Sequence, residues 1–155
     1  MTHEGKYYLT KEGLKKLKKE YNELIEKRKE NLKNGAPQFL HSEEMSAEFI
    51  SFKEENDYLR AQIENLGHIL NNYQIIKAPP KKDRDKVFIG AKVKFEHNGK
   101  EEEFMIVGTF EADPANGKIS HQSPVGKALL GHKVGDKVSV GVSNKKTYKI
   151  KSIKY

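Results

Sequence analysis

The chain contains neither cysteine nor tryptophan. The lack of cysteine excludes disulfides and thiolate metal sites, and it fits a reducing compartment. Only 35% of the 155 residues are hydrophobic, which leaves little apolar material for one large core. No run approaches the roughly 20 apolar residues that a membrane-spanning helix needs. The opening MTHEGKYYLT also lacks the apolar stretch of a secretory signal. We therefore expect a soluble, cytoplasmic protein that makes no membrane contact.

Charge is abundant instead, with 33% charged residues and a formal net charge of +7. This surplus favours contact with a polyanion or an acidic protein surface, but it is equally compatible with lysines that only keep a small protein in solution. Residues 1–34 hold ten Lys and Arg against six acids, whereas residues 42–75 hold two against seven. A basic segment and an acidic segment of this kind are able to pair along their edges.

Two segments carry residues spaced three and four apart, which is typical of a coiled-coil seam. The first comprises Leu14, Leu17, Tyr21, Leu24 and Arg28. The second comprises Phe49, Phe52, Asn56, Leu59, Ile63, Leu66, Leu70 and Tyr73, with Asn56 as a polar residue that would fix the register. Thr10 is placed to cap the first helix. Gly35 and Pro37 break the helix, which favours an antiparallel hairpin within one chain, and so a monomer, over an intermolecular coiled coil.

The pattern changes after a linker at 78–86, which is rich in proline and charge. Residues 87–95 alternate as a strand, Asn98-Gly99 predicts a type I′ turn, and residues 103–107 follow as the next strand. Ser123-Pro124 predicts the start of a short helix that ends at Gly131. Residues 138–142 and 147–153 predict a last strand pair. The sequence thus predicts an α+β protein with a helical hairpin at 1–77 and an antiparallel sheet with one short helix at 87–155.

No independent active site stands out in the sequence. The six histidines are scattered, and no pair has the i,i+4 spacing, with a carboxylate between, of a zinc-binding helix. A phosphate-binding glycine loop is also missing. Ser123 is better explained as a helix cap than as a nucleophile. We therefore expect no enzyme activity of its own and no cofactor in the isolated chain.

The segment 38–45, QFLHSEEM, lies where the hairpin must turn. Phe39 and Leu40 fall where no core is available, beside the carboxylates of Glu43 and Glu44. One interpretation is structural: Ser42 caps the second helix and the two glutamates complement its N-terminal dipole. That interpretation leaves the apolar residues of the segment unexplained.

Several motifs resemble those of the bacterial Gre-type transcript cleavage factors, in the order of that family and over nearly the whole chain. The N-terminal matches are YLTKEGLKKL at 8–17 and AEF at 47–49, followed by FKEE at 52–55. The C-terminal matches are FIGAKV at 88–93, IVG at 106–108, EADP at 111–114, GKIS at 117–120, SPVGKALLG at 123–131 and VGD at 134–136.

The resemblance implies an antiparallel coiled coil followed by a C-terminal domain of FKBP-like fold. It implies that this domain binds bacterial RNA polymerase at the rim of the secondary channel, through the residues Glu111, Asp113, Ser120, Ser123, Pro124 and Gly126. The hairpin then enters the channel, where tip acids help hold a catalytic Mg²⁺ beside backtracked RNA and the polymerase cuts the transcript. Here the tip acids would be Glu43 and Glu44, sharing the Mg²⁺ of the polymerase active centre.

Basic residues of the first helix are candidates for contact with the backtracked RNA 3′ end, and they are Lys15, Lys18, Lys19, Lys27 and Arg28. The alternative is that they form a solvated flank paired with the acidic second helix. The tip also departs from the family. Aligned without gaps from Ala47, the family's Asp and Glu fall on Ser42 and Met45. This departure leaves open a second hypothesis, a Gre-like regulator or inhibitor that binds polymerase without stimulating cleavage. A prolyl isomerase or chaperone role of the FKBP-like domain is a weaker alternative, because few aromatic residues are available for its pocket.

Overall fold

The computed structural model describes residues 6–37, 46–141 and 145–155. The chain divides into two compact units: one comprises Leu14–Asn72, and the other comprises Met1–Gly13 together with Tyr73–Tyr155. The sequence analysis placed the first boundary at residue 77 and a linker at 78–86. The structure groups both ends of that predicted hairpin domain, and the predicted linker, with the C-terminal sheet.

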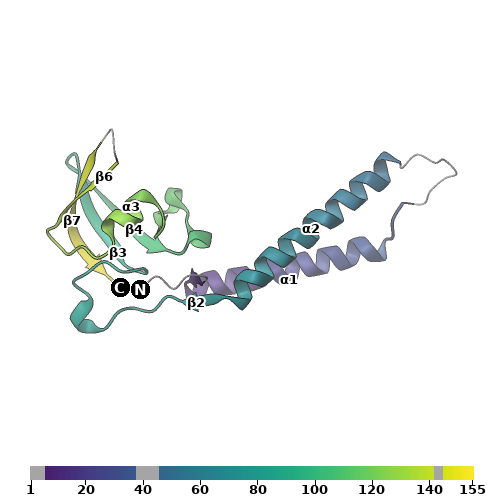
Figure 1. Ribbon diagram of the computed structural model, residues 1–155, viewed down its shortest axis with the longest axis horizontal. Coiled ribbons are helices and arrows are strands. Elements are labelled where there is room, and N and C mark those ends of the chain that lie inside the picture. The colour runs from purple at the N-terminus through teal and green to yellow at the C-terminus, as the bar shows by residue number, and fades with distance from the viewer. Residues whose placement is uncertain (1–5, 38–45, 142–144) are drawn as a thin grey trace. The chain divides into compact units, whose positions relative to one another are not determined.

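The first unit is a helical hairpin built from helices α1 (Lys11–Lys33) and α2 (Ala47–Asn71) (Figure 1). Helix α1 begins as predicted, because the Thr10 hydroxyl accepts a hydrogen bond from the Gly13 amide at 2.9 Å. It ends before Gly35, which takes a left-handed conformation with φ of 75°. Its neighbour α2 is capped by Ser46, whose Oγ accepts from the Phe49 amide at 3.2 Å. The prediction that Ser42 caps this helix is therefore wrong, since α2 begins four residues later.

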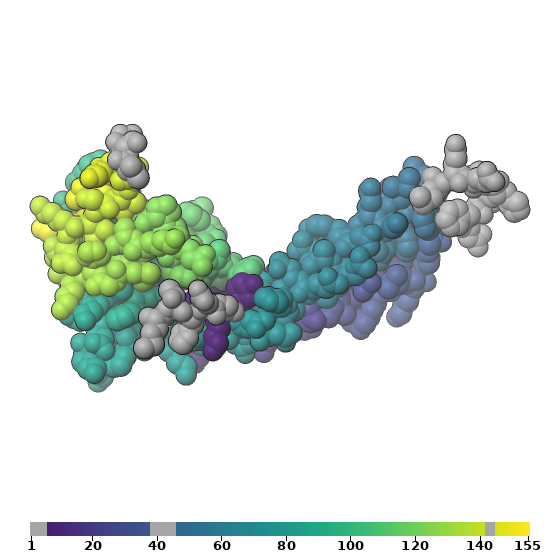
Figure 2. All heavy atoms as spheres, viewed as in Figure 1, coloured from purple at the N-terminus to yellow at the C-terminus, as the bar shows by residue number. Residues whose placement is uncertain are grey.

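The predicted seam is present in the hairpin. Its buried part lies in the N-terminal half of α1 and the C-terminal half of α2. The buried residues here are Leu17, Leu59, Leu66 and Ile69. Ile69 takes the place that the sequence analysis gave to Leu70, which is half-buried. In Figure 2 the two helices lie against each other as adjacent rods. No helix among the described residues is long and apolar enough to cross a membrane.

The polar residue of the seam, Asn56, has neighbours that are also polar. Its Nδ2 donates to the carbonyl oxygen of Phe52 at 2.9 Å, on its own helix. Its Oδ1 and the Nε of Arg28 are buried, and neither atom has a hydrogen-bond partner among the described residues. Beside them Lys27 forms an ion pair with Glu55 at 3.2 Å between the two helices. A hydrogen bond from Lys27, then one from the Asn31 side chain, and the charge of Lys27 lower the pKa of the Glu55 carboxyl. We call Arg28, Asn31 and Asn56 the polar layer of the hairpin.

The second unit contains a five-stranded sheet of order β5-β4-β3-β7-β6 (Figure 1). Its strands are β3 (Lys92–His97), β4 (Lys100–Val107), β5 (Lys118–Ser120), β6 (Lys137–Val140) and β7 (Lys146–Lys154). All neighbouring pairs are antiparallel except β4 and β5, which are parallel. Strand β5 was absent from the sequence prediction, so the sheet is mixed rather than purely antiparallel. The predicted turn is confirmed, because Asn98 and Gly99 have φ angles of 51° and 74°.

The core of this unit lies between the sheet and the short helix α3 (Pro124–Leu129). Phe95 is at its centre, fully buried, with Phe104 stacked on it and Tyr148 edge-on at 4.9 Å between ring centroids. The other buried residues are Val87, Ala91, Val93, Ile106, Ile119, Leu129, Val138 and Ile150. Burial on this scale provides the main stabilisation of the unit.

A second, two-stranded parallel sheet belongs to the same unit. It pairs β1 (Tyr7–Leu9) with β2 (Tyr73–Ile75). Strand β1 also lies close to the five-stranded sheet, because a Cβ on Gly108 would come within 1.8 Å of the Tyr8 carbonyl oxygen. Leu9 is almost completely buried. This pairing explains why residues at both ends of the predicted hairpin domain belong to the C-terminal unit.

Candidate functional site

Two loops of the C-terminal unit carry all six residues that the sequence analysis assigned to partner binding. The first loop contains the 3-10 helices η2 (Thr109–Glu111) and η3 (Pro114–Asn116), and the second joins β5 to α3. Hydrogen-bonding contacts of 3.3 Å join the Thr109 hydroxyl to Ser120 and Gln122, so the two loops lie side by side. The structure therefore places the two loops side by side, and we call their exposed surface the two-loop face, to which the buried Gly126 does not belong.

The second loop is held by its own hydrogen bonds. Ser123 caps α3 by accepting from the Gly126 amide at 3.0 Å, and its hydroxyl donates to the Ser120 carbonyl oxygen at 2.7 Å. Gly126 lies so close to this loop that a Cβ would come within 2.1 Å of the same carbonyl oxygen. Through these contacts Ser123 and Gly126 stabilise the local fold at the start of α3. Pro124, at the first position of α3, is exposed and remains available to a partner.

Glu111 is engaged with the first turn of α1. Its carboxylate accepts one hydrogen bond from the Thr10 amide at 2.6 Å and another from the Thr10 hydroxyl. Gly13 makes this contact possible, because a Cβ at that position would lie 2.1 Å from the Glu111 carboxyl carbon. The acid sits at the N-terminal end of a helix, where the helix dipole also favours a negative charge. Glu111 therefore fixes the start of α1 to the loop that contains η2, within one unit.

Asp113 closes the first loop. Its backbone exchanges hydrogen bonds with Lys118, and its Oδ2 accepts from the Asn116 side chain at 2.6 Å. Gly117 completes the turn with a left-handed φ of 70°. Asp113 itself is exposed.

The candidate RNA-contacting residues of α1 differ in their surroundings. Lys19 pairs with Glu23 at 3.6 Å, and Lys27 pairs with Glu55 across the hairpin. Arg28 is half-buried and contributes to the polar layer. Lys15 and Lys18 are exposed and form no ion pair with another described residue. Of the predicted set, these two lysines are the exposed residues that form no ion pair within the described part of the chain.

The predicted magnesium-binding acids Glu43 and Glu44 lie outside the described residues, as do Ser42 and Met45. Within 6–37, 46–141 and 145–155, no group of three His, Asp or Glu side chains is placed to hold a metal ion. The structure therefore leaves the tip assignment as a prediction.

Comparison with known protein families covers both units. The model described as "Transcription elongation factor, N-terminal" matches residues 7–75, and the model "Transcription elongation factor, GreA/GreB, C-term" matches residues 81–155. The chain belongs to the Gre family. Its relatives include the transcription elongation factor GreA of Halalkalibacterium halodurans, 40% identical over 145 residues, which cover 90% of each chain. The GreA of Clostridium acetobutylicum is 36% identical over 159 residues, covering 99% of this chain and all of the relative.

Two solved structures are similar to this Gre-family chain along its length. The GreA factor homolog 1 (Gfh1) of Thermus thermophilus is 26% identical and covers 97% of this chain and 99% of its own, with a TM-score of 0.42. A GreA/GreB elongation factor from Nitrosomonas europaea is 19% identical and covers 97% and 100%, with a TM-score of 0.43. At these scores the superpositions add nothing to the family assignment, which rests on sequence.

Sequence reasoning missed two contacts that shape this Gre-family surface. One is the contact of the Glu111 carboxylate with the space beside Gly13 that a Cβ would fill, which we call the Gly13 socket. The other is the packing of the Tyr8 ring against His121, edge-to-face with centroids 5.4 Å apart. Gly13 was a possible signal, because glycine inside a helical segment is unfavourable by about 1 kcal/mol relative to alanine and needs a reason. The Tyr8–His121 contact had no comparable local signal.

Proposed function

We propose that this protein is a transcription elongation factor that binds bacterial RNA polymerase and places its helical hairpin in the secondary channel. There it stimulates the polymerase to cleave backtracked RNA, which rescues arrested complexes. The observation that carries this proposal is the match of both Gre family models, in family order, to residues 7–75 and 81–155. The chemistry belongs to the polymerase active centre, and this chain contributes ligands to it.

The two-loop face is the proposed polymerase contact. Pro124 is the candidate for direct contact, since it is exposed at the first position of α3, directly after a loop that hydrogen bonds hold rigid. A rigid loop loses little conformational entropy on binding, which favours affinity. Pro124→Ala is expected to weaken competition for immobilised polymerase, whereas Val134→Ala, at an exposed apolar residue elsewhere in the unit, serves as the control.

The tip acids supply the proposed catalytic contribution. Carboxylates are preferred ligands of Mg²⁺, and a second metal ion stabilises the attacking and leaving oxygens of phosphoryl transfer. Glu43 and Glu44 are adjacent in sequence. Because neighbouring residues of a helix point about 100° apart, only a non-helical tip would allow both to reach one ion. A single ligand binds the ion more weakly, so cleavage by this factor is expected to need more Mg²⁺ than is usual for its family.

The deciding experiment is transcript cleavage in a stalled, backtracked elongation complex across a magnesium titration. The parent chain is compared with Glu43→Gln, Glu44→Gln and the double variant. Loss of cleavage in the double variant with unchanged polymerase binding supports the proposed role of the tip. Equal cleavage by the double variant and the parent would show that these carboxylates take no part in the reaction.

Lys15 and Lys18 extend the proposal to the RNA. Their charges, which pair with no acid of the described residues, suit phosphate contact, and such contacts weaken steeply as salt rises. Charge reversal at Lys18 is expected to reduce crosslinking to the extruded 3′ segment of backtracked RNA while leaving binding to RNA-free polymerase intact. Reversal at Lys29, whose charge is already paired with Glu26 at 2.8 Å, is the matched control. Unchanged crosslinking in both variants would favour a solvated flank.

The sequence of the tip favours a second candidate function. In the ungapped alignment the family's two acids fall on Ser42 and Met45, neither of which is charged. A factor that binds the channel without supplying a metal ligand would occupy it and regulate or inhibit the polymerase. The same assay separates the two functions: a parent chain that binds polymerase yet stimulates no cleavage at any Mg²⁺ concentration is a regulator.

A further inference from the structure

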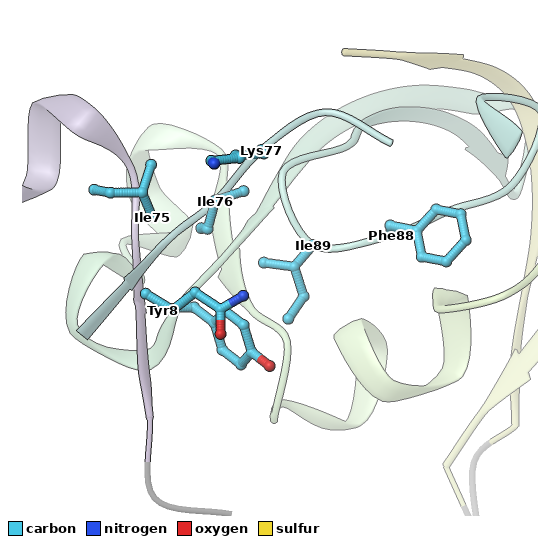
Figure 3. A pocket seen from close by; sticks show the side chains of 7 residues that line it. Tyr8, Ile75, Ile76, Lys77, Phe88 and Ile89 are labelled. Carbon is cyan, nitrogen blue, oxygen red and sulfur yellow. The ribbon is translucent and has the colours of Figure 1, made fainter. Parts of the chain in front are cut away.

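A pocket of about 530 Å³ opens on the C-terminal unit, apart from the hydrogen-bonded centre of the two-loop face. Four consecutive residues, Gln74–Lys77, line it together with Phe88, Ile89 and Tyr8 (Figure 3). In Figure 3 the Ile89 side chain and the Tyr8 ring face each other, and Phe88 lies on the opposite side of Ile89 from Tyr8. All of these residues belong to one compact unit. The pocket is therefore a feature of that unit alone.

The walls of the pocket are fixed by the backbone. The Ile76 amide donates to the carbonyl oxygen of Leu9 at 2.8 Å, and the Gly90 amide donates to that of Ile106 at 2.7 Å. The Phe88 amide donates to the Tyr155 hydroxyl at 2.9 Å. Gly90 adopts a φ of 95°, and a Cβ there would lie 2.6 Å from the Ile76 side chain. A pocket held in this way is preformed, which lowers the entropic cost of filling it.

The lining is mostly apolar, and it also contains the Gln74 amide and a single cation. Isoleucine, phenylalanine and tyrosine side chains form the walls, and Lys77 is the only charged residue among them. Lys77 is exposed and forms no ion pair with another described residue. Such a site suits an apolar side chain with a carboxylate close by, because the carboxylate would pair with Lys77 while the apolar group loses contact with water. The net charge of +7 also favours an acidic partner.

The pocket is continuous with the two-loop face. Tyr8 forms one of its walls, and the same ring packs edge-to-face on His121, with centroids 5.4 Å apart. His121 lies between Ser120 and Ser123, in the loop proposed to contact polymerase. Only the Tyr8 ring therefore separates a partner bound to that loop from the pocket.

We propose that this pocket is a second contact for RNA polymerase, and that it receives an apolar side chain from an acidic segment of the polymerase. The inference rests on the proposed function and adds a specific anchor to it. Binding hot spots are typically apolar or aromatic anchors that fill pockets, ringed by polar contacts that exclude water. A second copy of this chain is a poor occupant, since two chains of charge +7 repel each other. Nucleic acid is equally poor, because one lysine does not make a phosphate-binding surface.

The first test measures binding of the full-length chain to immobilised RNA polymerase by competition. Phe88→Ala is expected to weaken binding about tenfold, since truncating a hot-spot residue has effects of this size. Phe88 is 40% exposed, so the fold is expected to survive. Lys77→Glu is expected to weaken binding and to reduce its dependence on salt. The matched controls, Val134→Ala and Lys100→Glu, change exposed residues of the same unit and are expected to leave affinity unchanged.

The second test identifies the occupant. A photoreactive phenylalanine analogue placed at position 88 is expected to crosslink to a polymerase peptide that contains apolar and acidic residues, and excess parent chain should suppress the crosslink. Crosslinks confined to nucleic acid or to a second copy of this chain would overturn the proposal. So would a parent that binds polymerase while Phe88→Ala and Lys77→Glu bind equally well. A parent that does not bind polymerase at all would instead overturn the proposed function.

Discussion

The C-terminal unit and the hairpin differ most in what lies at their centres. The C-terminal unit is built around Phe95 and a set of fully buried aliphatic residues, and its loops are closed by short hydrogen bonds. The described part of the hairpin buries four apolar residues at its seam, and it also contains buried polar atoms, on Arg28 and Asn56, that have no hydrogen-bond partner among the described residues. The difference indicates a division of tasks. A densely packed unit suits a fixed binding face, whereas a thin coiled coil has little core to stabilise it.

Removing the central aromatic residue of the sheet is expected to have the largest effect. Phe95→Ala should lower the free energy of unfolding of the C-terminal unit by about 3–5 kcal/mol, because it leaves a cavity between Phe104 and Tyr148. Hydrogen exchange resolved by residue is the measurement, since it reports the amides of β3 and β4 separately from those of α2. Val134→Ala, an exposed truncation, is the control. Equal loss of protection in both units would mean that they unfold together and would break the comparison.

Filling the socket at Gly13 is expected to have the next largest effect. Gly13→Ala should destabilise the C-terminal unit by about 1–3 kcal/mol, because the new methyl group displaces the Glu111 carboxylate from Thr10. Gly67→Ala is the matched control in the hairpin. A Cβ there meets only the Tyr21 ring at 3.6 Å, an ordinary contact, so alanine should stabilise the helix by about 1 kcal/mol.

A double-mutant cycle sharpens this result. Glu111→Ala alone removes the hydrogen bonds to Thr10, so adding Gly13→Ala to it should cost nothing further, and the helix propensity of alanine should then be gained. Urea unfolding of the four proteins measures the coupling. Additive effects would show that Gly13 and Glu111 do not share the space that the structure assigns to them.

Replacing Asn56 of the polar layer is expected to raise the free energy of unfolding rather than lower it. Asn56→Leu should stabilise the hairpin by roughly 1–2 kcal/mol, because it removes a buried oxygen to which no described residue donates a hydrogen bond. Asn65→Leu, at an exposed position of the same helix, is the control and should change little. Thermal unfolding followed by helical circular dichroism measures both. A destabilised Asn56→Leu variant would indicate that the polar layer is satisfied in solution.

The smallest expected effect is a pH dependence in the turn between α3 and β6. The Lys133 amide, and then the His132 side chain, hold the pKa of the Asp136 carboxyl below its usual value of 3.8. A lowered folded-state pKa gives stability that is present above the unfolded value and is lost as the pH falls through the folded value. The difference in melting temperature between the parent and Asp136→Asn should therefore shrink from about pH 6 to about pH 2. Parallel curves for the two proteins would contradict this.

Local signals in the sequence were enough to predict most elements and their ends. The caps at Thr10 and Ser123, the turn at Asn98-Gly99 and the strand alternation after residue 87 each depend on neighbours in the chain. Strand β5 was missed because it has only three residues and pairs in parallel with β4, which leaves no hairpin signal. The β1–β2 pair was missed for a similar reason, since its strands lie on either side of the whole hairpin.

The candidate site was predicted less completely than the fold. The family motifs located the two-loop face, and the structure brings those residues together. The individual tasks of Glu111, Ser123 and Gly126 depend on contacts within the folded unit that spacing does not encode. The pocket combines residues from three distant stretches of the chain, so no single stretch of sequence indicated it.

The socket between Gly13 and Glu111 has a consequence for how this sequence can diverge. The carboxylate occupies the volume that a methyl group at position 13 would need, so the two positions cannot vary independently. A lineage that acquires alanine at 13 must first, or at the same time, shorten the residue at 111 and find another partner for the amide of Thr10. Substitutions at two sites far apart in the chain should therefore appear together across descendants of this protein, as a covarying pair.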